Sequence, residues 1–127
     1  MISITLEHTD SLGPEADLPA LLVKLAERLG AARLAPGTLV RVGARALTEY
    51  VVGEGGWESL TAAIRVPAAD IEAFKADLFD DLAALIEHHF AELYARRSIA
   101  VSVALDVLGR EALYERRHPR PASAESF

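Results

Sequence analysis

Two arginines, Arg41 and Arg45, lie in the segment 39–47 and could hold an anionic small molecule. The whole chain has a net charge of −6, so an anionic ligand meets a repulsive general field that local arginines must overcome. The same charge excludes a general electrostatic attraction to nucleic acid or to an anionic membrane. Two interpretations of Arg41 therefore stay open, a substrate contact and an ordinary solvated strand residue.

The other residues that could do chemistry favour structural roles. Glu7 and Asp10 could pair as a general acid and base, but ordinary surface carboxylates explain them better. His88 and His89 are neighbours on a predicted helix, where adjacent side chains point about 100° apart and do not converge on a metal ion. The glycines of segment 53–56 lack the following Lys and Ser or Thr of a phosphate-binding loop, so they predict a hairpin turn.

The composition also limits where the protein can work. The chain has no cysteine, which excludes disulfides, thiolate catalysis and cysteine-bound metals, and agrees with a reducing compartment. Its apolar runs are too short to span a bilayer. Residues 1–7 lack the basic start of a signal peptide. We therefore expect a soluble, cytoplasmic protein.

The hydrophobic pattern predicts six elements. Alternating apolar and polar residues indicate strands, and apolar residues three or four positions apart indicate helices. In chain order the prediction is strand, helix, strand, then again strand, helix, strand, over residues 2–8, 18–29, 39–47, 60–66, 71–93 and 99–107. Asp17 is expected to cap the first helix and Gly30 to end it.

The second helix is expected to run without interruption after Pro67. Its predicted apolar stripe consists of Ile71, Phe74, Leu78, Leu82, Leu85, His89 and Leu93. These residues are spaced three or four apart, so they should face the sheet together.

Two consecutive β-α-β units predict a fold of the α/β (α+β) class. A crossover helix makes the two strands of each unit parallel, so the simplest product is a four-stranded mixed sheet with both helices on one face. We expect one domain over residues 1–118, with halves at about 1–50 and 57–108, and a flexible tail over 119–127.

The face of the sheet without helices should carry small, weakly polar side chains. A bare sheet face of this kind is expected to be covered by another subunit. The residues concerned are Ser3, Thr5, Ala63, Ala100, Ser102 and Ala104.

Two β-α-β units in a chain this short resemble the tautomerase superfamily, and within it the 5-carboxymethyl-2-hydroxymuconate isomerase family. The most specific likeness is the stretch Glu15-Ala16-Asp17-Leu18-Pro19, which opens the first helix. Further similar residues follow it or lie near the end of the second helix: Leu21, Lys24, Leu85, Ile86, His89, Phe90 and Leu93. These are structural signatures and not chemical motifs.

The resemblance implies a homotrimer that moves a proton between a dienol and an unsaturated ketone, without a metal or another cofactor. It implies a small carboxylated substrate from aromatic-ring cleavage, an N-terminal proline as the base, and arginines that hold carboxylates and polarise the carbonyl. Arg41 lies where the family has such an arginine on the second strand, and Arg45 lies nearby. The loop before the second helix has Asp70 where the family has an arginine, and a carboxylate there would repel an anionic substrate.

The sequence departs from the family at its start, where Ile2 and not proline follows Met1. A backbone amide at Ile2 cannot act as a base. Met1 is expected to be retained, and an unperturbed α-amine has a pKa of about 7.7–8.0, close to the useful range. That amine would lie one residue, about 3.3–3.6 Å, beyond the family position. If Met1 were removed, Ile2 would present a primary amine in the family position.

Two functional hypotheses follow from these residues. The first is an isomerase of a small carboxylated dienol, in which Met1 or Ile2 supplies the base and Arg41 gives electrostatic help to catalysis. In this hypothesis Arg41 and Arg45 both contact the substrate. The second is a catalytically inactive relative that keeps the trimer and acts as a ligand-binding or structural protein.

Overall fold

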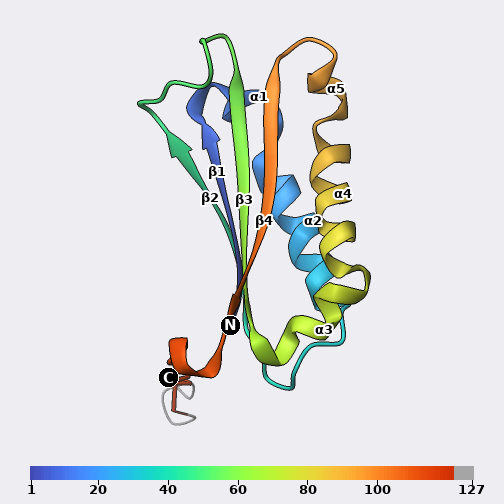
Figure 1. Ribbon diagram of the computed structural model, residues 1–127, viewed down its shortest axis with the longest axis vertical. Coiled ribbons are helices and arrows are strands. Elements are labelled where there is room, and N and C mark those ends of the chain that lie inside the picture. Colours follow the sequence, from blue (N-terminus) through green and yellow to red (C-terminus); the bar gives the residue numbers. More distant parts are fainter. Residues whose placement is uncertain (122–127) are drawn as a thin grey trace.

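The structure is a computed structural model that describes residues 1–121. Its centre is a sheet of four strands, β1 (Ile2–Thr9), β2 (Val40–Leu47), β3 (Glu58–Pro67) and β4 (Ile99–Leu108). The strand order is β2-β1-β3-β4. β1 is parallel to β2, β3 is parallel to β4, and β1 and β3 are antiparallel (Figure 1). The predicted mixed sheet of two β-α-β units is therefore confirmed.

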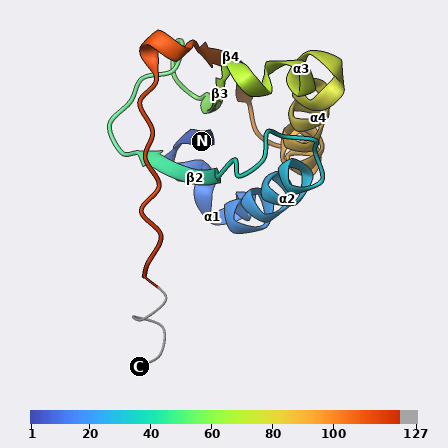
Figure 2. The same cartoon turned by 90° about the horizontal axis from the view of Figure 1, so that it is seen from below.

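The α-helices of both crossovers cover one face of this sheet, as predicted (Figures 1 and 2). They bury the apolar side of the strands, which includes Ile4, Leu6 and Ile64. The first unit contains α1 (Gly13–Ala16) and α2 (Leu18–Gly30), and the second contains α3 (Ile71–Ala73), α4 (Phe79–His89) and α5 (Ala91–Tyr94).

The start and end of α2 agree with the sequence prediction. Asp17 lies just before the helix with φ 46° and ψ 57°, and its Oδ1 accepts a hydrogen bond from the amide of Ala20 at 3.4 Å. An aspartate tolerates this left-handed conformation better than most residues and satisfies one of the free amides of the first turn. The helix ends at Gly30.

The second crossover is not the uninterrupted helix that the sequence predicts. A 3-10 turn (Ala68–Asp70) precedes α3, and a π-helical turn (Phe74–Leu78) separates α3 from α4. The wider π turn changes the rotation of the helix that follows it. Buried residues then recur four apart, so Ile86 and Phe90 face the sheet where the prediction had Leu85 and His89.

His89 has a structural role, as predicted. Its Nε2 lies 2.5 Å from the carbonyl oxygen of Ala16, and its Nδ1 lies 3.2 Å from Nζ of Lys24. The ring therefore joins the C-terminal part of α4 to the junction of α1 and α2.

The glycine-rich loop connects β2 to β3, but the predicted hairpin is wrong. Gly53, Gly55 and Gly56 have φ values of 58°, 95° and 77°, which favour glycine. However, β1 lies between β2 and β3 in the sheet. The loop must therefore pass over the end of β1, because the two strands that it joins are not neighbours.

The small side chains of the sheet lie on the face without helices. Ala63, Ala100, Ser102 and Ala104 are exposed there. Ser3 is buried and Thr5 is half-buried on the same side of β1. This face is thus partly covered by the chain itself near Ser3 and open to solvent over β3 and β4.

Candidate active site

A cavity of about 240 Å³ lies where the N-terminus, the sheet and the C-terminal segment meet. Figure 2 shows this segment on the side of the sheet opposite the helices. The sheet supplies Ser3 from β1, Arg41 from β2, and Arg65 from β3. The remaining lining residues are Met1, Leu108, Ala112, Leu113, Tyr114 and Glu115.

The strand register places the two arginines on either side of Ser3. Ser3 is opposite Arg41 on the parallel neighbour and opposite Arg65 on the antiparallel neighbour. Side chains opposite each other in a sheet share a face. Ile4 and Ile64 alternate with these positions and are buried under the helices, so both arginines project to the helix-free face.

Met1 lines this cavity, and its α-amine forms an ion pair with Glu115, which also lines it. The next nitrogen along the chain, that of Ile2, donates a hydrogen bond to the carbonyl oxygen of Leu39 at 2.8 Å. The side chain of Ile2 is fully buried in the core. With Met1 present, the amine at the site is therefore that of Met1, and a role for Ile2 stays a prediction for a chain without Met1.

Arg45 is not brought to this cavity. It lies opposite Glu7 in the register, four residues beyond Arg41, and its Nη2 is 2.7 Å from Oε2 of Glu7. The arginine is 69% exposed. Arg45 and Glu7 thus form a surface ion pair, and neither residue lines the cavity at Met1.

Arg65 is a site residue that the sequence reasoning missed. It lies on the polar side of an alternating strand, and that pattern alone does not distinguish it from a solvated arginine. Its partner is Asp106, with Nε 3.7 Å from Oδ2, and both side chains are more than half exposed. An exposed pair at this distance is weak, so Arg65 is able to contact a ligand in the cavity.

Asp70 does not line the cavity, contrary to the expectation that it would face an anionic substrate. It is buried and accepts hydrogen bonds from the amide of Ala35 at 2.6 Å and from Oγ1 of Thr38 at 3.4 Å. Its carboxylate holds the loop between α2 and β2. Asp70 therefore does not place a repulsive charge in the cavity.

The cavity combines one amine, two guanidinium groups and one carboxylate from the chain. Within residues 1–121, no group of three or more His, Asp or Glu side chains could hold a metal ion. Burial raises the pKa of the Tyr94 hydroxyl above its ordinary value, and a hydrogen bond to Glu87 adds to this effect. That hydroxyl stays protonated and belongs to the helical layer, so it is not a candidate base for this site.

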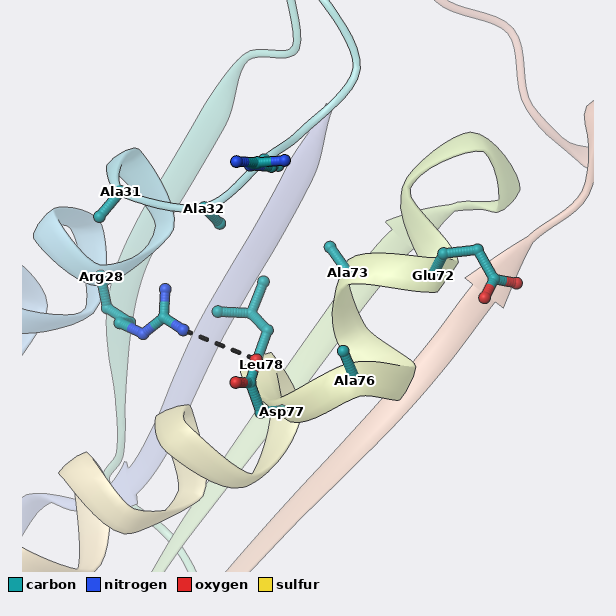
Figure 3. Close-up of a pocket in the computed structure, with 9 residues that line it drawn as sticks. Arg28, Ala31, Ala32, Glu72, Ala73, Ala76, Asp77 and Leu78 are labelled. Carbon is teal, nitrogen blue, oxygen red and sulfur yellow. Dashed lines mark ion pairs between the residues drawn. The ribbon is translucent and has the colours of Figure 1, made fainter.

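A larger cavity of about 440 Å³ lies on the helical side, between the end of α2 and the π-helical turn (Figure 3). Arg28 borders it and forms ion pairs with Asp77 at 3.9 Å and with Asp81 at 2.7 Å. Much of the remaining lining consists of methyl groups, from Ala31, Ala32, Ala73 and Ala76. Arg28, Asp77 and Glu72 are engaged in ion pairs, and neither lysine nor the N-terminal residue lines this cavity. The cavity at Met1 is therefore the better candidate active site.

No helix within the described residues is long and apolar enough to cross a membrane. Comparison with the curated proteins gives no match. The sequence profile of the 5-carboxymethyl-2-hydroxymuconate isomerase family matches residues 3–118.

Solved structures with the same fold include a 5-carboxymethyl-2-hydroxymuconate isomerase from Deinococcus radiodurans R1. It is 27% identical, with a TM-score of 0.78, over 92% of this chain and 90% of that one. A 5-carboxymethyl-2-hydroxymuconate delta-isomerase has a TM-score of 0.78 at 18% identity, over 94% of this chain and 89% of that one. N1, a member of the cis-3-chloroacrylic acid dehalogenase family, has a TM-score of 0.62 at 19% identity. This match covers 98% of this chain and 88% of N1.

These matches extend over nearly the whole chain, and the family profile includes the strands that carry Arg41 and Arg65. They support an isomerase-like function and do not favour the inactive alternative. The chain belongs to the 5-carboxymethyl-2-hydroxymuconate isomerase family.

Proposed function

We propose that this protein isomerises a small carboxylated dienol to the unsaturated ketone, with the α-amine of Met1 as the base. The observation that carries the proposal is the convergence of this amine with Arg41 and Arg65 on one cavity. A proton shift on an anionic substrate needs a base and a positive charge that stabilises the intermediate anion, and the amine and the two guanidinium groups can supply them.

The reaction transfers one proton and needs no cofactor. The unprotonated amine of Met1 takes a proton from the dienol, which leaves a negative charge spread over the conjugated oxygen and carbons. Arg41 and Arg65 stabilise this charge and hold a substrate carboxylate. The Met1 ammonium then returns the proton to a carbon of the conjugated chain, which gives the unsaturated ketone and restores the amine.

The test is conversion of a 2-hydroxymuconate-type dienol, followed by ultraviolet absorbance on protein whose intact mass shows that Met1 is present. We expect conversion well above the rate in buffer. If folded protein that retains Met1 adds nothing to the buffer rate, the proposed activity is wrong.

We also propose that the chain forms a homotrimer in the cytoplasm. The exposed small residues on the helix-free face, among them Ala63, Ala100 and Ala104, support contact with another copy. Light scattering should give the mass of three chains of 13.7 kDa each. The mass of a single chain would rule out the trimer.

A further inference from the structure

The proposed catalytic amine is engaged by a carboxylate of the chain itself, that of Glu115. Glu115 forms an ion pair with the Met1 α-amine, and both residues line the cavity that contains Arg41 and Arg65. The proposed substrate also brings a carboxylate into this cavity. Glu115 therefore has the same chemical group as the ligand that the site is expected to bind.

Glu115 and a carboxylate ligand would compete for the same cationic groups of the cavity. Three cationic groups line it, the Met1 amine, Arg41 and Arg65, and Glu115 is the carboxylate that lines it with them. Asp106 contacts Arg65 at 3.7 Å from outside that lining. A carboxylate ligand that enters the cavity competes with Glu115 for the field of these three cationic groups, because two carboxylates in the same small cavity repel each other.

Glu115 belongs to a segment that is weakly attached to the rest of the protein. We call residues 109–117 the C-terminal strap. It contains one 3-10 turn (Arg110–Ala112), and most of its side chains are exposed, Tyr114 at 85%. Figure 2 shows it passing across the helix-free side toward β2.

Polar contacts hold the strap near the site. Apart from the ion pair with Met1, Nη1 of Arg117 donates a hydrogen bond to the carbonyl oxygen of Gly37 at 2.8 Å. Exposed polar contacts contribute little stability, and segments with few buried apolar contacts open at low free-energy cost. The strap can therefore release the amine without unfolding of the sheet.

We propose that Glu115 is an internal competitor of the substrate carboxylate, and that the C-terminal strap closes the site until a carboxylate ligand displaces Glu115. This inference rests on the proposed function of the Met1 amine. The strap would keep the amine paired with Glu115 in the free protein and would make its release depend on the ligand's own negative charge.

The decisive variant is Glu115→Gln, which keeps the size of the side chain and removes its charge. Glu111→Gln is the matched control, because Glu111 lies in the same strap and does not line the cavity. Neither residue is buried, so both variants should keep the melting temperature of the parent. Circular dichroism checks this before any comparison of rates.

The first measurement is independent of catalysis. Mass spectrometry follows the rate at which an acylating reagent modifies the Met1 amine, with Lys24 and Lys75 of the same molecules as internal references. We expect Glu115→Gln to increase the Met1 rate about two- to fivefold, the range that loss of an exposed ion pair allows. Glu111→Gln should leave it unchanged. Maleate, a simple dicarboxylate, should protect the amine at lower concentration in Glu115→Gln than in the parent.

The second measurement is kcat/KM for the dienol, which should rise by a similar factor in Glu115→Gln, mainly through a lower KM. An unchanged or slower acylation of Met1 in this variant overturns the proposal. A fall in kcat/KM also overturns it, because Glu115 would then assist turnover. If acylation and maleate protection change as expected while no variant converts the dienol, the strap is supported and the proposed isomerase activity has failed.

Discussion

Selective acylation of the Met1 α-amine should lower the isomerisation rate about 10²–10⁴-fold, the usual contribution of a general base. An acylated nitrogen is an amide and can no longer accept a proton. The physical basis is that this amine lines the same cavity as Arg41 and Arg65, whereas the nitrogen of Ile2 is engaged with the carbonyl oxygen of Leu39.

Lysines must be separated from the α-amine in this experiment. The chain contains Lys24 and Lys75, and neither lines the cavity. α-Amines have pKa values about 2.5 units below those of lysines, so acylation near pH 7 favours the N-terminus. A Lys24→Arg, Lys75→Arg variant gives a chain in which the α-amine is the remaining primary amine. Full activity of this variant after complete acylation of Met1 would exclude the amine as the base.

Substitution of Arg41 by methionine should lower kcat/KM about 10- to 150-fold. Methionine keeps much of the length of the side chain and removes the charge. Hydrogen bonds to charged groups contribute about 1.5–3 kcal/mol, and each 1.36 kcal/mol corresponds to a tenfold change in rate. The loss should affect both substrate binding and kcat, since Arg41 is proposed to stabilise the charge that develops on the dienol.

Arg45→Met is the matched control for Arg41→Met. Both arginines lie on β2 and both are exposed, but Arg45 pairs with Glu7 and does not line the cavity. We expect Arg45→Met to keep kcat/KM within about twofold of the parent, as for a surface substitution away from the site. Equal losses in the two variants would show that the general positive charge of β2, and not the position of Arg41, supports the reaction.

The sequence determined the strands and the first helix because their periodicity is local, whereas the π-helical turn of the second crossover was not predicted. Alternation in β4 and helical spacing in α2 both persist in the structure, since each pattern buries one side of its own element. The cap at Asp17 was also predictable, because it depends on residues only three positions apart. The mixed sheet then followed from the order of the elements and the handedness of crossover connections.

The family resemblance also allowed two residues of the site to be predicted from the sequence. The amine of Met1 and the guanidinium of Arg41 were both candidates, and the structure brings them to one cavity. The same reasoning also named Arg45 as a substrate contact, because a strand of eight residues leaves open which of its positions reaches the end where the N-terminus lies.

Only the tertiary structure decided which charges meet. Arg65 reaches the site through the antiparallel register that pairs it with Ser3, and Glu115 reaches the Met1 amine across 114 positions of sequence. Asp70 is turned away from the site because the amide of Ala35 provides its partner. Local periodicity carries no information on contacts between distant segments, so the amine, the two arginines and their competing carboxylate become one site only when the sheet and the strap are folded.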